Sequence, residues 1–157
     1  MKSSRKNYNM EKFNSEKVVF DGITFQSKLE RFCYQKLKES NLDFGYETES
    51  ITLLPPMKLS NVKVFCPKKR TGGIVIVSEL SQRKTVAKTS YTPDFLVKKG
   101  KYRIYIETKG KPNDAYPYRK KLFIHQLELR KDKYEYIFME PHNNRQVMWA
   151  IDFITKL

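Results

Sequence analysis

The sequence predicts an α/β fold in which a mixed β-sheet core is flanked by helices. Segments with alternating apolar residues, typical of strands, occur between segments whose apolar residues recur every three or four positions, typical of helices. Of the 157 residues, 39% are apolar, and 10 Phe and 10 Tyr are spread through these segments, which suits a packed core and not a disordered chain. The lack of repeats and low-complexity segments favours one domain over residues 18–157, preceded by a flexible basic arm over residues 1–17.

Local signals define the elements expected in the first half of the chain. The pair Asp21-Gly22, flanked by apolar residues, is typical of a hairpin turn. Ser27 and Glu30 have the spacing of a capping box, which predicts the start of a helix, and Cys33 falls on the apolar stripe of that helix. In order, we expect a hairpin over residues 18–25, a helix over 27–40, a strand over 44–54 and an inserted hairpin with basic tips over about 57–90.

The second half of the chain predicts a further set of strands and two helices. We expect strands over residues 92–97 and 102–108, a helix over 116–130, a strand over 134–139 and a closing helix over 147–154. A two-residue turn at Lys99-Gly100 pairs Phe95 with Ile104, so that the apolar residues of both strands share one face. Trp149, in the closing helix, is expected to lie in the core.

Positive charge is concentrated in two segments. The chain has 31 Lys and Arg against 17 Asp and Glu, which gives a net charge of +14. Residues 58–104 carry a net charge of +10 and residues 109–133 carry +5. Such a concentration suits a polyanion, because each neutralised phosphate releases condensed counterions, and nucleic acid is therefore the expected partner. The alternative is a basic surface without a partner.

Several classes of protein are disfavoured by what the sequence lacks. No run approaches the roughly 18 to 20 apolar residues that span a bilayer, and the first residues contain no apolar signal-peptide stretch. We therefore expect a cytoplasmic protein that does not bind membranes, in which Cys33 and Cys66 remain thiols. The sequence has no Gly-rich phosphate-binding loop, so no nucleotide cofactor is expected. The two histidines, His125 and His142, lack metal-ligand spacing, and His125 is expected either on a helix surface or semi-buried.

The strongest chemical signal lies at the ends of the two strands that flank Gly100. Alternation places Glu107 and Lys109 on one face, and the expected register places Asp94 diagonal to Glu107. Two neighbouring carboxylates repel unless something pairs them, and Mg²⁺ binds one or two carboxylates together with waters and phosphate oxygens. A lysine beside such a site orients the attacking water and offsets charge in phosphodiester hydrolysis. The alternative is an exposed Glu107–Lys109 ion pair, with Asp94 in an ordinary turn after Pro93.

These residues also match a known pattern. Pro93-Asp94, a gap of twelve residues and then Glu107-Thr108-Lys109 resemble the motif of the PD-(D/E)xK nuclease superfamily. The segment FQSKLE at residues 25–30 resembles the helix-borne glutamate that precedes that motif. The similarity is greatest to the bacteriophage endonuclease I family of Holliday-junction-resolving enzymes, and it covers most of residues 25–125. The resemblance implies a restriction-endonuclease-like fold, a nuclease domain over residues 18–157 and a phage or bacterial origin.

The resemblance also assigns roles to individual residues. By it, Asp94 and Glu107 are metal ligands, Lys109 is the catalytic lysine, and Glu30 is a carboxylate that binds a second metal ion or positions water. The implied cofactor is Mg²⁺, for which Mn²⁺ is expected to substitute. The implied activity is hydrolysis of DNA phosphodiesters, with a preference for branched DNA such as four-way junctions, by a homodimer whose two active sites make paired cuts. The insertion at residues 57–90 is longer than expected in that family and leaves the dimer geometry open.

Seven basic residues are candidates for contacts with DNA. They lie in the inserted hairpin and around the start of the helix at residue 116, namely Lys68, Lys69, Arg70, Lys111, Arg119, Lys120 and Lys121. The alternative for residues 119–121 is a solvated helix face. Two other functions remain open at this point. One is a transposase- or restriction-type nuclease of the same superfamily whose targeting depends on partner proteins, and the other is a nonenzymatic basic nucleic-acid-binding module.

Overall fold

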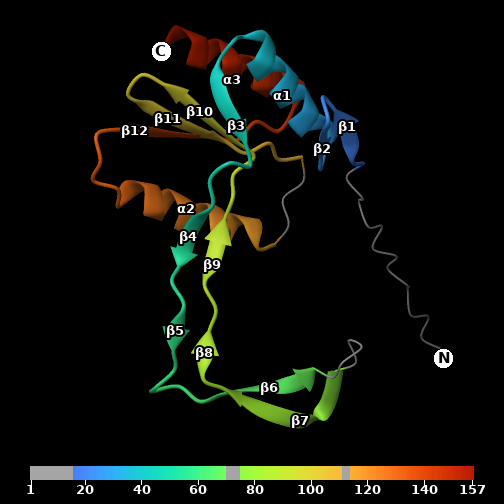
Figure 1. Cartoon of the computed structure of the whole chain (residues 1–157), viewed down its shortest axis with the longest axis vertical. Coiled ribbons are helices and arrows are strands. Elements are labelled where there is room, and N and C mark those ends of the chain that lie inside the picture. The colour runs from blue at the N-terminus through green and yellow to red at the C-terminus, as the bar shows by residue number, and fades with distance from the viewer. Residues whose placement is uncertain (1–15, 70–74, 111–113) are drawn as a thin grey trace, which may run out of the picture.

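The centre of the fold is a four-stranded mixed sheet, seen in a computed structural model that describes residues 16–69, 75–110 and 114–157 (Figure 1). The strands, in spatial order, are β12 (Glu135–Met139), β11 (Tyr102–Ile106), β10 (Phe95–Lys99) and β3 (Asp43–Tyr46). The pairs β3–β10 and β10–β11 are antiparallel, whereas β12 is parallel to β11. The connection from β11 to β12 contains a helix, as a parallel pair requires. The predicted mixed α/β architecture is confirmed.

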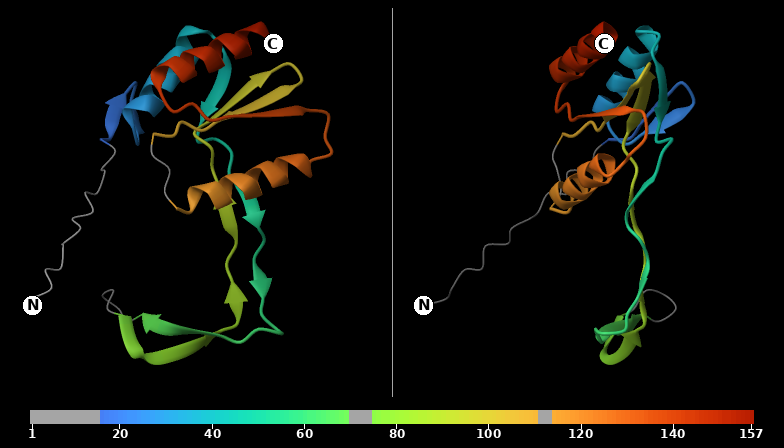
Figure 2. Two further views of the ribbon diagram at one scale, coloured as in Figure 1. Left: turned by 180° about the vertical axis from the view of Figure 1, so that it is seen from behind. Right: turned by 90° about the vertical axis from the view of Figure 1, so that its left-hand side faces the viewer.

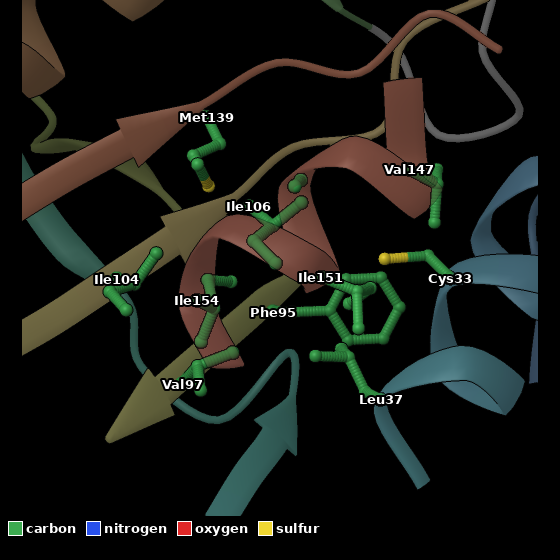
Figure 3. Close-up of a cluster of buried hydrophobic side chains, with 11 residues drawn as sticks. Cys33, Leu37, Phe95, Val97, Ile104, Ile106, Met139, Val147, Ile151 and Ile154 are labelled. Atoms are coloured by element: carbon green, nitrogen blue, oxygen red, sulfur yellow. The ribbon is translucent and has the colours of Figure 1, made fainter. Parts of the chain in front are cut away.

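Helices cover both faces of this sheet (Figure 2). Helices α1 (Lys28–Glu39) and α3 (Asn144–Lys156) pack on one face, and α2 (Tyr116–Glu128) lies against the other. The first core contains alternate residues of β10 and β11 packed against α1 and α3 (Figure 3). The second core places the intervening residues, Leu96 and Tyr105, against Phe123 and Leu127 of α2. Because both faces are buried, the strands that carry the site are held rigidly.

The register of β10 and β11 differs from the predicted one by two residues. Phe95 pairs with Ile106 instead of Ile104, and Lys99 pairs with Tyr102. The turn is therefore Gly100-Lys101, with Gly100 at φ +53°, the left-handed region that favours glycine. A shift of two residues leaves every side chain on its predicted face, since the side-chain period of a strand is two.

The start of α1 is confirmed in detail. The Ser27 side chain accepts a hydrogen bond from the backbone N–H of Glu30, and the Ser27 hydroxyl donates to the Glu30 carboxylate. The preceding hairpin, β1 (Val18–Phe20) and β2 (Ile23–Phe25), turns at Asp21-Gly22. Both turn residues have positive φ, as the predicted two-residue turn requires. Cys33 is a buried free thiol in the first core, as expected.

The predicted strand over residues 44–54 is interrupted in the structure. It divides into β3 and β4 (Ile51–Leu54), because the chain turns at Glu47, which has φ +49°. The N–H of Glu47 donates to the Asp94 carbonyl at 2.8 Å. The predicted strand over residues 92–97 begins later in the structure, as β10 at Phe95, and a separate strand, β9 (Thr89–Tyr91), precedes it. Proline at 93 has no N–H to continue a ladder, so the break falls directly before Asp94.

The predicted hairpin at residues 57–90 is present as a chain of antiparallel strand pairs. The pairs are β4–β9, β5 (Met57–Lys58) with β8 (Thr85–Val86), and β6 (Val64–Lys69) with β7 (Val75–Arg83). Together they form a long arm, defined here as residues 51–91, that extends away from the sheet in all three views (Figures 1 and 2). The predicted N-terminal arm lies outside the described residues except for Glu16 and Lys17.

The prediction for Trp149 is wrong. Helix α3 is longer than predicted, and its buried residues Val147, Ala150, Ile151 and Ile154 follow the three- and four-residue spacing of one helix face. Trp149 lies off that face, is 63% exposed and stacks on Phe153. No helix in the described parts of the chain is long and apolar enough to cross a bilayer.

Candidate active site

The site lies where the arm enters the sheet. Asp94 directly precedes β10 and Glu107 directly follows β11, so continuing the observed register places the two residues opposite each other. The backbone N–H of Asp94 donates to Glu107 Oε2 at 3.3 Å. The Glu107 side chain is buried, and its backbone N–H is held by the Met139 carbonyl. The structure thus brings these two predicted residues closer than the diagonal arrangement expected from the sequence.

The Asp94 carboxylate is oriented by one residue. The backbone N–H and the hydroxyl of Thr108 both donate to Asp94 Oδ2, each at 2.7 Å. Asp94 Oδ1 makes no hydrogen bond to the residues that the structure describes, and it is not a fully buried atom. One carboxylate oxygen is therefore fixed while the other remains available to a ligand.

Lys109 stands beside Glu107, as the strand alternation predicts. Its Nζ lies 3.4 Å from Glu107 Oε1 and 4.4 Å from the centre of the Tyr116 ring. The backbone N–H of Lys109 donates to the Pro141 carbonyl, which ties the end of β11 to the segment after β12. Its ammonium group is thus held over an aromatic face next to a carboxylate, instead of extending into solvent.

Glu30 is close enough to act on the site but has its own hydrogen-bond partners. Its Oε2 accepts from the Gln26 N–H at 2.8 Å and from the Tyr46 hydroxyl at 3.1 Å, and Ser27 binds Oε1. In the described residues, no three acidic, histidine or cysteine side chains gather closely enough to enclose a metal ion. The structure therefore brings Asp94, Glu107 and Lys109 together and leaves Glu30 outside that group, although its charge still affects Asp94.

Electrostatics distinguish this pair from an ordinary surface ion pair. Burial raises the pKa of Asp94 to about 8, and the negative charges of Glu107 and Glu30 contribute, although the Thr108 hydrogen bonds oppose the shift. Burial also raises the pKa of Glu107, while the nearby Tyr91 hydroxyl and Lys109 oppose that change. Two carboxylates close together and poorly solvated favour binding of a proton or a cation. The alternative of an exposed Glu107–Lys109 ion pair is wrong, because the Glu107 side chain is buried.

Two tyrosines that sequence reasoning missed line the same site. A pocket of about 230 Å³ is lined by Ser90, Tyr91, Thr92, Glu107, Lys109, Tyr116 and Arg119. Burial raises the pKa of Tyr91, and the charge of Glu107 raises it further. The Tyr91 hydroxyl lies close enough to influence the pKa of Glu107, but its position does not meet the geometry of a hydrogen bond. The sequence did offer one indication for Tyr91, because it lies only three residues before the predicted site residue Asp94.

The predicted DNA-binding residues fall into four groups. Lys120 is paired with Glu140 at 2.7 Å, and Glu140 also accepts from the Tyr116 hydroxyl. Arg119 and Lys121 are exposed on α2, and Arg119 lines the pocket. Lys68 and Lys69 belong to β6 at the far end of the arm. Arg70 and Lys111 lie outside the described residues. His125 is exposed on α2, as expected.

Comparison with known proteins gives one family. Residues 10–144 match the profile of a family described as a protein of unknown function (DUF1064). The chain belongs to this DUF1064 family. No curated protein and no solved structure has significant similarity to the chain. The region shared with the DUF1064 family contains the arm and all four predicted catalytic residues.

The raised pKa of Asp94 predicts a specific pH dependence of stability. Between the ordinary pKa of 3.8 and about 8, the folded protein retains a proton that the unfolded chain has released, so stability falls as pH rises through this window. In EDTA, Asp94→Asn should melt at a higher temperature than the wild type at about pH 8, and the difference should shrink towards about pH 5. Thermal unfolding monitored across that range tests this expectation.

The control for that experiment is Asp132→Asn. Its carboxylate is exposed, and the Tyr136 hydroxyl lowers its pKa. The difference between this variant and the wild type should therefore not change between about pH 5 and pH 8. A constant difference for Asp94→Asn as well would contradict the electrostatic description of the site.

Proposed function

We propose that this DUF1064 protein is a Mg²⁺-dependent endodeoxyribonuclease with a restriction-endonuclease-like fold, whose active site contains Asp94, Glu107 and Lys109. The observation that carries the proposal is the pair formed by half-buried Asp94 and buried Glu107, with a lysine ammonium 3.4 Å from Glu107. This arrangement supplies a site for a hard cation and a fixed positive charge beside it. Both stabilise the negative charge that develops during metal-dependent phosphodiester hydrolysis.

The available oxygen atoms suit Mg²⁺. Asp94 Oδ1 has no hydrogen-bond partner in the described chain, and the ligands Mg²⁺ prefers are one or two carboxylates completed by waters and phosphate oxygens. A cation here also offsets the effects of burial and of the Glu107 charge, which together keep the pKa of Asp94 high. When bound, Mg²⁺ supplies Lewis-acid polarisation of a phosphoryl oxygen. Asp94 and Glu107 would hold it, with Mn²⁺ as the expected substitute.

The protein groups around the cation have separate tasks in this proposal. Lys109 stabilises negative charge on the phosphoryl oxygens, because its ammonium is held in place by Glu107 and the Tyr116 ring. Thr108 keeps the Asp94 carboxylate in one orientation through two hydrogen bonds. Glu30, fixed by Gln26 and Tyr46, would position water or a second cation.

The substrate in this proposal is DNA, with branched DNA such as four-way junctions preferred. The support is the distribution of positive charge, with a net +10 over residues 58–104 that include most of the arm. Arg83, Lys84 and Lys88 are exposed near the base of the hairpin β6–β7 and along the return strand. An arm extending from the site (Figure 1) suits contacts with DNA beyond the cut. Paired cuts across a junction would require two copies of the chain.

Loss of Lys109 should separate catalysis from binding. We expect Lys109→Ala to lower single-turnover cleavage of a four-way junction in Mg²⁺ by about 10² or more, the usual effect of removing one electrostatic stabiliser of a transition state. Junction affinity in Ca²⁺ should remain close to that of the wild type. Asp94→Asn should abolish cleavage and weaken Mn²⁺ binding measured by calorimetry, because a ligand charge is lost.

The matched control is Lys156→Ala, which removes an exposed lysine that pairs with Asp152 on α3. This variant should cut at the wild-type rate. If Lys109→Ala also cuts at that rate, Lys109 is only the ion-pair partner of Glu107. If the wild-type protein nicks neither a supercoiled plasmid nor a junction in Mg²⁺ or Mn²⁺, the proposed function is wrong.

The arm should contribute to binding and not to chemistry. Replacing Arg83, Lys84 and Lys88 with Ser should weaken junction binding and reduce the slope of log affinity against log salt by about 0.9 for each phosphate that the arm no longer neutralises. Single-turnover cleavage at saturating enzyme should be unchanged. A control variant replaces three ion-paired lysines of the body, Lys38, Lys101 and Lys156. Equal losses of affinity in both variants would mean that the arm has no special role.

A further inference from the structure

Tyr91 carries a buried hydroxyl group without a hydrogen bond. The residue is 7% exposed, and its hydroxyl has no hydrogen-bond partner among the residues that the structure describes. Leaving a buried hydroxyl unpaired destabilises a folded protein, so such groups are uncommon. If the site binds a ligand, a hydrogen bond from this hydroxyl to the ligand would explain why it has no partner within the protein.

Other tyrosines packed against the core show the usual arrangement. The hydroxyl of Tyr105 donates to Glu49 at 2.6 Å, that of Tyr116 donates to Glu140 at 2.7 Å, and that of Tyr46 donates to Glu30 at 3.1 Å. Each of these phenols therefore has a carboxylate partner within the protein. Tyr91 differs from them although the carboxylate of Glu107 is nearby.

The position of the Tyr91 side chain is fixed by its surroundings. Its backbone belongs to β9 and pairs with Ile51 of β4, and its ring packs on Phe123 with ring centres 5.0 Å apart. The side chain cannot turn away to find another partner without disturbing the second core. Tyr91 thus remains among the residues that line the pocket, together with Glu107, Lys109 and Arg119.

We infer that Tyr91 is a catalytic residue whose hydroxyl donates a hydrogen bond to a nonbridging oxygen of the scissile phosphate. This inference rests on the proposed nuclease function. The pocket of about 230 Å³ has room for a phosphate group, and four of its other lining residues have side chains that can donate hydrogen bonds, namely Ser90, Thr92, Lys109 and Arg119. A phenol is protonated at neutral pH and is therefore a donor, which suits a phosphate oxygen.

The test compares two tyrosine variants with opposite expectations. Tyr91→Phe should lower single-turnover cleavage in Mg²⁺ by about 10², while the melting temperature of the metal-free protein is unchanged or rises, since only an unpaired group is lost. Tyr105→Phe removes a hydroxyl that binds both Glu49 and Arg130. It should lower the melting temperature and leave cleavage at saturating enzyme unchanged.

Each outcome bears on the inference. Wild-type cleavage by Tyr91→Phe, alongside an active wild-type enzyme, overturns the role of Tyr91 and leaves the proposed function intact. A melting temperature lowered as much as in Tyr105→Phe also overturns it, because the hydroxyl is then already paired inside the folded protein. A wild-type protein that cuts no DNA refutes the proposed function itself, and the role of Tyr91 with it.

Discussion

The repulsion between two poorly solvated carboxylates is the constraint on which the site depends. Asp94 and Glu107 are held together by the pairing of β10 with β11, a pairing that the two buried cores make rigid. Thr108 and Lys109 offset part of the repulsion, through hydrogen bonds to Asp94 and an ion pair with Glu107. The remaining negative charge of the two carboxylates favours binding of a cation at this position, and the proposed function follows from that preference.

The breaks in the strands at Glu47 and Pro93 place the base of the arm beside the site. The chain leaves the sheet at Glu47 and returns at Pro93, and both ends of the arm therefore meet beside Asp94. The hydrogen bond from the Glu47 N–H to the Asp94 carbonyl fixes this crossing at the base of the arm. In the proposed function, a force on the arm from bound DNA would therefore be transmitted to the residues that precede Asp94. This connection gives a physical reason for an arm to be inserted at this point of the chain.

Much of the site was predictable because it depends on local periodicity. Glu107 and Lys109 lie on the same face because side chains alternate along a strand. The two-residue error in the predicted register did not change that face. The capping role of Ser27 and Glu30 depends on residues three apart and was predicted for the same reason. The pocket tyrosines were not predicted, because Tyr91 and Tyr116 meet Glu107 only through the packing of β9 and α2. Trp149 was misplaced because aromatic character indicates burial only when the residue lies on the buried face of its helix.

The central claim is that Asp94 and Glu107 bind one divalent cation between them. Diffraction from crystals grown with Mn²⁺, recorded at a wavelength where manganese scatters anomalously, tests it most directly. The account predicts one strong anomalous peak within about 2.2 Å of oxygens from both carboxylates, the distance expected for a small hard cation, and no such peak in Asp94→Asn crystals. A wild-type structure in which Mn²⁺ binds elsewhere, with both carboxylates free of metal, would contradict the account.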